Sequence, residues 1–440
     1  MTIVSNWSNY PKVDSKLYGV SSKDEVFQKL KTNGNYIVRG NGRCYGDASL
    51  NDNIISCLPL NKFLSFDTVN GILEVQSGVL LDDILKVIVP KQWFLPVTPG
   101  TKFITIGGAV ASDVHGKNHH LEGSLSNHVQ SLEIMLADGR IETCSPSQNA
   151  DLYWATCGGM GLTGVILSVK FSLKPIKSSY ISQTSYKAGS LDEILGLFEE
   201  TKGSTYSVAW IDCLKGGKHF GRSLLFTGEH FDPQESSVKL KNPFKLHPDP
   251  KINVPLNLPG ITLNKYSIKM FNMVYYNKVL GKTKKSIDHY DPFFYPLDAV
   301  LNWNRMYGKR GFTQYQFVLP LEERSGLERI LRKIQQQGMG SFLAVLKVFG
   351  EQNDLISFPM KGYTLALDFA MNNKLFKFLD ELDQMVLSYG GRIYMTKDSR
   401  MNKDIFWKSY PRVNEFVEIV KKYNPDAKIN SLLSQRLEII

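Results

Sequence analysis

Residues 99–120 constrain the fold of this chain more than any other stretch. They bring together glycine turns at Gly100 and Gly107, a short predicted helix and the sequence His-Gly-Lys-Asn-His-His at residues 115–120. Glycine lets a backbone approach a phosphate group or a flat ring closely, and imidazole and ammonium groups beside it can hydrogen-bond or hold charge. A second glycine-rich segment lies upstream at residues 39–47. Together the two segments indicate a cradle for a cofactor.

Length and composition are those of a globular protein with more than one domain. The chain has 440 residues, of which 42% are hydrophobic and 21% are charged, and a chain of this length usually divides into separate cores. No apolar run approaches the roughly 18 residues that a membrane span needs. Residues 1–10 also lack the basic and apolar regions of a signal peptide. We therefore expect a cytoplasmic protein, with peripheral contact at the inner face of the membrane as an option.

The cysteines argue against a disulfide framework and against a structural zinc site. Their number is odd, no two are spaced as Cys-x-x-Cys, and all lie in the first half of the chain: Cys44, Cys57, Cys144, Cys157 and Cys213. Paired spacings are what such frameworks and zinc sites require. We predict free thiols in a reducing compartment. No metal site is expected either, because no carboxylate or thiolate clearly accompanies the three histidines at residues 115–120.

Hydrophobic patterning divides the chain into three parts. Residues 1–175 are predicted to form a first domain, residues 176–392 a second, and residues 393–440 a segment that returns to the first. In the first part the expected elements are strands at 35–39 and 71–78, a helix at 80–89 and a hairpin at 129–144. In the second part the expected strands are at 206–213, 311–320, 343–349 and 363–369, and the expected helices at 191–201, 321–337 and 373–389. Six prolines between residues 231 and 265 predict a long mobile loop there.

The sequence Gly-Met-Gly-Leu-Thr-Gly at residues 159–164 fits the GxGxxG pattern of dinucleotide-binding folds. That fingerprint needs a strand before it and a helix after it. Here residues 151–157 are helix-like and residues 165–173 alternate like a strand, so the order is reversed. We predict a glycine turn between a helix and a strand, whose backbone can still lie against a cofactor.

Several motifs resemble those of a known flavoprotein family. The sequence Arg-Gly-Asn-Gly-Arg at 39–43, with Tyr-Gly-Asp at 45–47, resembles the pyrophosphate loop of vanillyl-alcohol-oxidase-type flavoproteins, and residues 105–116 resemble their second flavin segment. Within that superfamily the chain is most similar to the decaprenylphosphoryl-β-D-ribose 2-oxidase family, over nearly its whole length. The motifs that carry this resemblance are residues 97–101, 115–120, 312–317, 396–400 and 410–413.

The resemblance implies an α+β fold with two domains, a PCMH-type FAD-binding domain and a substrate domain built on an antiparallel sheet flanked by helices. It also implies FAD as the cofactor. Arg43 and Cys44 stand where many superfamily members carry a histidine that attaches FAD, so we predict non-covalent FAD, with a thioether at Cys44 as the alternative. The residues expected to bind FAD are Arg39, Gly40, Asn41, Gly42, Arg43, Cys44, Tyr45, Gly46, Thr101, Gly107, Gly108, Ser112, His115, Gly116, Asn118, His119, Gly161, Gly164, Val165, Tyr394 and Lys397.

The same resemblance implies that Lys397, His115 and Lys347 are the catalytic residues. The sequence alone does not decide which of the three is the base. Lys117 should also lie near the flavin and the substrate. The residues expected to bind substrate are His115, Trp210, Tyr307, Gln314, Gln316, Lys347, Thr364, Ala366 and Lys397. Some family members carry cysteine at the position of Ala366 and asparagine at that of Thr364, so thiol-directed compounds should not attach at Ala366.

The implied reaction is FAD-dependent oxidation of the ribose C2 hydroxyl of a polyprenylphosphoryl-β-D-ribose to the 2-keto sugar. In the family this is the first half of an epimerisation to the arabinose donor used in cell-wall glycan synthesis, and an NADH-dependent short-chain reductase is the partner that completes it. Two other readings stay open. One is an aldonolactone or alditol oxidase that uses oxygen on the same fold, and the other is a flavin-binding protein without turnover.

The positive charge of the chain is concentrated in residues 239–285. This segment holds ten lysines and a single acidic residue, so it carries +9 of the net charge of +10. Aromatic and aliphatic side chains between Phe271 and Leu280 accompany the lysines. Such a mixture predicts peripheral contact with an anionic membrane, although a solvated basic loop fits the composition equally well. No nucleic-acid-binding motif is present, and we expect no such partner.

Overall fold

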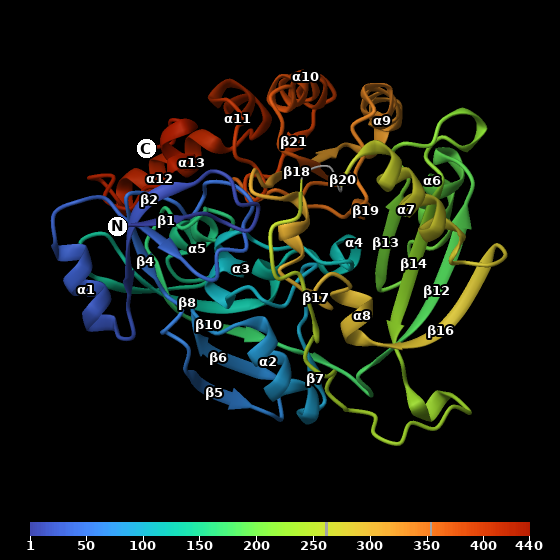
Figure 1. The fold of residues 1–440 in the computed structure, drawn as a ribbon. Helices are drawn as coiled ribbons and strands as arrows, with labels where there is room; N and C mark the ends of the chain where they lie inside the picture. The colour runs from blue at the N-terminus through green and yellow to red at the C-terminus, as the bar shows by residue number, and fades with distance from the viewer. Residues whose placement is uncertain (260–262, 353) are drawn as a thin grey trace.

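The computed structural model describes residues 1–259, 263–352 and 354–440 (Figure 1). Both chain ends lie on one side of the molecule, where the first strands meet the last helices, and the strands from the middle of the chain form the other side. None of the helices in these described ranges is both long and apolar enough to span a membrane.

Two small sheets build the side that holds the chain ends. The first has the order β1-β2-β4-β3 and consists of β1 (Thr2–Val4), β2 (Val13–Gly19), β3 (Ile37–Arg39) and β4 (Asn53–Ser56). The second has the order β5-β6-β10-β8-β9 and consists of β5 (Phe63–Asp67), β6 (Ile72–Gln76), β8 (Val129–Met135), β9 (Ile141–Cys144) and β10 (Val165–Ser172). Strands β8 and β9 are the predicted hairpin, and Gly139 in its turn adopts the positive φ, +91°, that glycine tolerates best.

A larger sheet builds the other side of the molecule. All its strand pairs are antiparallel, in the order β16-β12-β14-β13-β19-β20-β18-β21. Its strands are β12 (Tyr180–Ala188), β13 (Tyr206–Ile211), β14 (Ser223–His230), β16 (Thr283–His289), β18 (Phe312–Leu319), β19 (Ala344–Phe349), β20 (Gly362–Ala370) and β21 (Arg392–Ile393). The short pairs β7 (Trp93–Phe94) with β11 (Lys174–Pro175) and β15 (Ile252–Asn253) with β17 (Val300–Leu301) lie outside it. The expectation of an antiparallel sheet flanked by helices is confirmed.

Helices cover the sheets and end the chain. They are α1 (Lys23–Lys31), α2 (Leu81–Ile88), α3 (Ile106–Ala111), α4 (His119–Glu122), α5 (Ala150–Thr156), α6 (Leu191–Glu200), α7 (Lys265–Asn277), α8 (Tyr290–Phe294), α9 (Arg324–Gln337), α10 (Leu375–Ser388), α11 (Lys403–Ser409), α12 (Val413–Tyr423) and α13 (Leu432–Arg436). Helices α6, α9 and α10 pack on one face of the large sheet (Figure 1).

The two faces of the large sheet differ in chemistry because side chains alternate along a strand. Tyr315 and Phe317 of β18 point into the core beneath the covering helices. Gln314 and Gln316 of the same strand, with Lys347 of β19, line a cavity on the opposite face. Aromatic and amide residues alternate along β18, so the amides lie on the sheet face that is turned toward the first part of the chain.

The C-terminal segment packs against the N-terminal sheets. Helix α12 contacts α5, and the Asn51 Nδ2 donates to the Asn430 backbone oxygen at 2.8 Å. The Arg436 guanidinium binds the Asp47 carboxylate through two hydrogen bonds of 2.9 Å. These contacts join the two ends of the chain, while the domain limits at residues 175 and 392 stay a prediction.

The fold bears on three predictions of local structure. The glycine turn at residues 159–164 runs from helix α5 to strand β10, so the dinucleotide-binding interpretation is excluded as predicted. The basic segment is not a loop throughout, since residues 265–277 form helix α7, capped by the Asn264 side chain. The loop expected at 231–265 is largely irregular, and its residues 260–262 lie outside the described ranges.

Candidate flavin and substrate site

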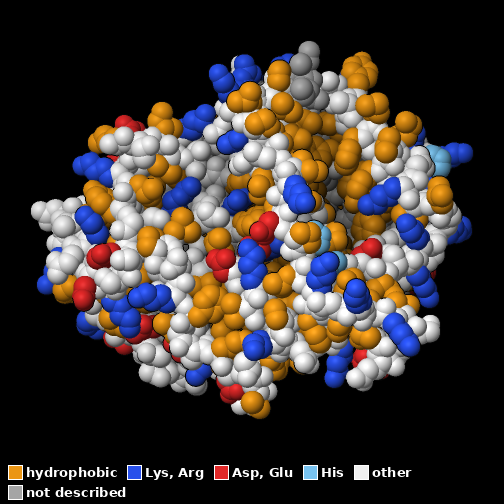
Figure 2. All heavy atoms as spheres, turned by 60° about the horizontal axis from the view of Figure 1, so that its bottom comes forward, with side chains coloured by type: hydrophobic (Ala, Val, Ile, Leu, Met, Phe, Trp, Pro, Cys, Tyr) orange, Lys and Arg blue, Asp and Glu red, His pale blue; other side chains and the backbone are white. Residues whose placement is uncertain are grey.

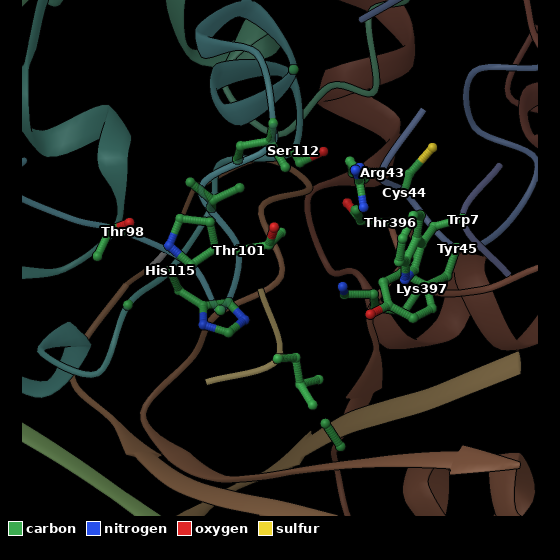
Figure 3. Close-up of a pocket in the computed structure, with 18 of the residues that line it drawn as sticks. Trp7, Arg43, Cys44, Tyr45, Thr98, Thr101, Ser112, His115, Thr396 and Lys397 are labelled. Carbon is green, nitrogen blue, oxygen red and sulfur yellow. The ribbon is translucent and has the colours of Figure 1, made fainter. Parts of the chain in front are cut away.

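One cavity of about 570 Å³ collects most of the predicted site residues, a volume in the range of small-molecule and cofactor sites. The face of the molecule in Figure 2 is hollowed, with hydrophobic side chains along the hollow and lysine or arginine side chains around it. In Figure 3, Trp7, Arg43, Tyr45 and Lys397 gather on one side of the cavity, and His115 lies across from them. Chain segments far apart in sequence therefore share one site.

The loop after β3 offers unpaired donors to this cavity. The backbone N–H groups of residues 41–44 donate to no acceptor among the described residues, and such a run of N–H groups in a turn attracts anions. Gly42 has a φ of +59°, and a Cβ at Gly46 would lie 1.5 Å from the Asp398 oxygen. The glycines are thus required by the turn and by close packing on the C-terminal segment.

The second glycine segment forms the opposite wall. Thr105 caps helix α3, because its Oγ1 accepts from the Gly108 N–H at 3.2 Å. Gly40 packs against Thr105, where a Cβ would meet the threonine Oγ1 at 2.1 Å. Gly161 also lines the cavity, and a Cβ there would meet no atom within 4 Å. These open backbone surfaces and the unpaired N–H groups fit a large anionic ring cofactor such as FAD.

His115 contacts two strands of the large sheet, β18 and β19. Its Nδ1 lies 3.0 Å from the Lys347 Nζ, and its Nε2 lies 3.2 Å from the Gln316 amide. Burial, and then the charge of Lys347, hold the pKa of His115 well below its usual value, so the ring is neutral at pH 7. The Gln316 atom that faces the ring is the amide Nε2, which also donates to Thr364 Oγ1 at 3.3 Å. An amide nitrogen is a donor, so it pairs with the ring when His115 Nε2 accepts.

Lys117, Lys347 and Lys397 line the cavity and have lowered pKa values. Burial lowers the pKa of Lys117 to about 7. Burial, with the charges of Lys117 and Lys397, lowers the pKa of Lys347 to about 7. Burial lowers the pKa of Lys397 to about 8, although Asp368 acts in the opposite direction. Lys397 places its Nζ 3.8 Å from the Tyr45 ring centroid.

Asp368 orients a glutamine on the cavity wall. It lies opposite Gln314 in the β18–β20 register and accepts a hydrogen bond of 2.6 Å from the Gln314 Nε2. This bond uses an amide N–H of Gln314 and leaves its carbonyl oxygen available as an acceptor. A substrate hydroxyl in the cavity would therefore find an acceptor at Gln314.

Most of the predicted residues line the cavity, and seven do not: Arg39, Gly46, Asn118, His119, Val165, Tyr307 and Thr364. Tyr307 stacks on Phe312 with ring centroids 4.3 Å apart, and Val165 is in the core of the five-stranded sheet. Gly46 packs on the Asp398 backbone. The side chains of the other four residues turn to backbone or polar partners behind the wall, as in the bond from Thr364 Oγ1 to the Phe317 oxygen at 2.9 Å. They can support the wall but do not face its interior.

The three histidines at residues 115–120 do not converge. His119 pairs with Gln352, with Nε2 2.7 Å from Oε1, and His120 lies 2.9 Å from the Ser204 oxygen. His115 alone of the three lines the cavity. Within the described ranges, no group of three or more histidine, cysteine or acidic residues is arranged to hold a metal ion.

Trp7 and Asp298 are among the cavity residues that the motifs did not indicate. The Arg43 guanidinium carbon lies 3.8 Å from the centroid of the Trp7 ring. The Asp298 carboxylate accepts from Thr101 Oγ1 and from the Lys102 N–H, both at 2.8 Å. Both Trp7 and Asp298 line the cavity. Each reaches the site through contacts distant in sequence, so no local pattern marks it.

Known proteins match this chain in sequence and in fold. Residues 25–145 match a family described as an FAD binding domain. The chain is 36% identical to decaprenylphosphoryl-β-D-ribose oxidase of Mycolicibacterium smegmatis, over 92% of this chain and 89% of that protein. It is 28% identical to an uncharacterized protein of Streptomyces coelicolor, over 82% of this chain and 100% of that protein. The solved structure of Physcomitrella patens BBE-like 1 has a TM-score of 0.67 over 94% of this chain and 89% of that one, at 12% identity, a likeness of fold alone.

The fold and the match to an FAD binding domain define the class: this is an FAD-dependent oxidoreductase with the PCMH-type fold. Identity of 36% over nearly the full length of both chains then decides the family. The chain belongs to the decaprenylphosphoryl-β-D-ribose oxidase family.

Proposed function

We propose that this protein oxidises the C2 hydroxyl of a polyprenylphosphoryl-β-D-ribose to the 2-keto sugar, the first half of an epimerisation to the arabinose donor. The observation that carries the proposal is the group formed by His115, Lys347 and Gln316, which lies in the same cavity as the glycine segments. Amide, imidazole and ammonium groups suit the hydroxyls and the phosphate of a phosphorylated sugar.

FAD binds without a covalent bond in this proposal. The unpaired N–H groups of residues 41–44 would hold its pyrophosphate, and Lys397 and His115 would serve its ring and the substrate. Burial raises the pKa of the Cys44 thiol, which disfavours the thiolate that a thioether link would need. Bound FAD would supply the two-electron oxidising capacity that loss of a hydride from ribose C2 requires.

Lys347 is the group that accepts the proton from the C2 hydroxyl. A general base works best when its pKa is near the working pH, and among the three candidates only Lys347 combines a pKa of about 7 with contact to a second site residue. His115 fixes the Lys347 Nζ, and Gln316 and Gln314 position the sugar hydroxyls. Lys117 and Lys397 supply positive charge for the substrate phosphate.

Isotopic substitution tests this assignment of the reacting carbon. Deuterium at ribose C2 should slow anaerobic reduction of the bound flavin several-fold, whereas deuterium at C3 should not change its rate. Equal rates of flavin reduction for the unlabelled substrate and both deuterated substrates would contradict hydride loss from C2. Rapid peroxide release from soluble aldonolactones or alditols would favour the oxygen-using alternative instead.

The proposal also includes partners. Its keto product needs an NADH-dependent short-chain reductase to complete the epimerisation. A lipid-linked substrate lies in a bilayer, and the lysines of residues 239–285 would hold the protein at an anionic surface. We therefore propose a cytoplasmic protein that binds peripherally to the inner membrane face.

A further inference from the structure

Helix α7 is apolar on two faces. Its inner face is anchored to the large sheet, since the Asn272 Nδ2 donates to the Asp212 carboxylate at 2.7 Å and the Tyr276 hydroxyl donates to the Ala188 oxygen at 3.1 Å. Its outer face carries an apolar stripe at i, i+4, i+7 and i+8 spacing, which places the side chains on one side of a helix. The members of this outer stripe are 52–72% exposed: Tyr266, Met270, Met273 and Val274.

The site cavity extends toward the inner side of α7. Beyond Lys347 its wall includes the apolar side chains of Val208, Trp210, Phe226 and Tyr275, which we call the apolar branch, and Gln183 and Asp288 of the neighbouring strands also line the cavity. Val208 and Phe226 are cross-strand partners on β13 and β14. The rings of Trp210 and Tyr275 lie 4.9 Å apart, so the sheet and the inner side of α7 meet along this branch.

A lysine stands at the end of the branch. The Lys278 Nζ lies 3.6 Å from the Tyr275 ring centroid and 4.9 Å from that of Phe226, and Lys278 is itself exposed while lining the cavity. Lys265 and Lys269 are also exposed on α7. Cations beside an exposed apolar stripe match the surface of an anionic bilayer.

We propose that the apolar branch holds the first isoprene units of the substrate's lipid chain and that the outer stripe of α7 lies on the membrane from which that chain comes. The inference rests on the proposed function. One helix then has two tasks: its outer stripe enters the lipid surface, and its inner side covers the path from that surface to Lys347. An apolar chain suits the branch because Val208, Trp210, Phe226 and Tyr275 offer it aromatic and aliphatic contacts.

Chain length is the variable that tests the branch. Phosphoryl-ribose with a farnesyl chain should have a KM at least about tenfold below that of the same compound with one isoprene unit, because each buried methylene adds binding energy. Val208→Asp should reduce this KM ratio by about tenfold, since a carboxylate there opposes an apolar chain. Val87→Asp, on an exposed position of α2, should keep the wild-type ratio.

The outcomes separate the branch from the proposed function. If neither compound reduces the wild-type flavin, the proposed function is wrong. If both compounds reduce the flavin with equal KM, or if Val208→Asp keeps the wild-type KM ratio, the apolar branch does not bind the lipid chain and the proposed function stands. Should Val208→Asp fail to fold, Phe226→Ala provides the same comparison, because it shortens a wall residue without adding charge.

Vesicle binding tests the outer stripe. The double variant Met273→Glu, Val274→Glu should sediment with phosphatidylglycerol vesicles several-fold less than the wild type. The control Val69→Glu, at an exposed site between β5 and β6, should sediment with the vesicles as the wild type does. Thermal unfolding and FAD content check that the double variant is folded. Unchanged sedimentation of the folded double variant would overturn the membrane role of α7.

Discussion

Lys117, Lys347 and Lys397 have no acidic side chain in ion-pair contact among the described residues. Buried or half-buried lysines normally pair with carboxylates, and here burial lowers their pKa values instead. An anion beside Lys117 or Lys397 would restore the charge of that lysine, whereas Lys347, the proposed base, works as the neutral amine. At the scale of residues, the proposed site thus offers positive charge to phosphates and a neutral amine to the sugar hydroxyl.

Replacing Lys347 by methionine tests its role as base. The substitution keeps much of the side-chain volume and removes the amine, so kcat should fall by about 10²–10⁴ while FAD content stays near that of the wild type. Lys333→Met, a surface change on α9, is the matched control. A kcat within about twofold of the wild type in Lys347→Met would assign the base elsewhere.

The pKa of Lys347 also predicts a pH profile. Its pKa is lowered to about 7, so the neutral amine that can accept a proton accumulates as pH rises through 7. Because kcat/KM reports the free enzyme, wild-type kcat/KM should rise with pH across that value and then level. The rising limb should be absent from Lys347→Met, and a limb that persists there would belong to another group.

At the scale of elements, the loop after β3 and the start of the C-terminal segment act as one unit. Gly46 has no room for a side chain beside the Asp398 oxygen, and the Tyr45 N–H donates to the Thr396 oxygen at 2.9 Å. This contact holds the proposed pyrophosphate loop next to Lys397. The spacing of the proposed FAD-binding groups thus depends on backbone packing between distant parts of the chain.

Gly46→Ala should separate the two segments. The added methyl group forces the loop away from Asp398, so we expect FAD affinity to fall at least about tenfold and stability to drop by about 1–3 kcal/mol, as for overpacked sites. Gly203→Ala is the control, because a Cβ there would meet no atom within 4 Å. Fluorescence titration with FAD and urea unfolding measure the two effects, and wild-type FAD affinity in Gly46→Ala would contradict the argument.

Local patterns predicted much of the element structure. The alternating residues 312–319 form β18, and the Asp138-Gly139 turn connects β8 and β9, because strand period and turn chemistry are local properties. Helix α7 was missed, since its lysines and aromatics follow a proline-rich loop and it is apolar on two faces rather than one. The positions of Trp7 and Asp298 could not be predicted, because only tertiary packing brings them to the cavity.

At the scale of the whole molecule, a buried cation ties the first part of the chain to the middle. The Lys102 Nζ lies 3.0 Å from an Asp82 oxygen and 2.6 Å from an Asp291 oxygen, and all three side chains are at least nine-tenths buried. Burial acts to lower the pKa of Lys102, but Asp291 and Asp82 together raise it above its usual value. The residues lie in or beside helix α2, the Pro99–Lys102 turn region and helix α8, so the triad fixes how these parts meet.

Lys102→Met should therefore destabilise the fold. Removing the cation leaves the buried Asp291 carboxylate without its lysine partner, while Asp82 keeps Lys86 at 2.7 Å. Breaking a buried ion pair in this way costs about 3–5 kcal/mol of unfolding free energy. Lys23→Met removes an exposed partner of Glu133 and should change stability by less than about 1 kcal/mol. Urea unfolding monitored by tryptophan fluorescence compares the two, and a similar small loss in both would show that the triad adds no stability.

Residues 239–285, the basic segment, carry a strong positive charge. Four charge reversals, Lys239→Glu, Lys241→Glu, Lys245→Glu and Lys251→Glu, should strongly reduce binding to anionic vesicles, because each lysine near such a surface contributes about 1 kcal/mol. Binding of the wild type should weaken with salt, as screening predicts. Salt-independent binding that survives the four reversals would remove the electrostatic role of this segment.

An anaerobic titration of the purified holoenzyme with polyprenylphosphoryl-β-D-ribose tests the proposed substrate most directly. We expect the oxidised flavin absorbance to bleach in proportion to added substrate and the sugar product to be a ketone two hydrogens lighter. A flavin that stays oxidised at saturating substrate, with the sugar recovered unchanged, would contradict this substrate assignment.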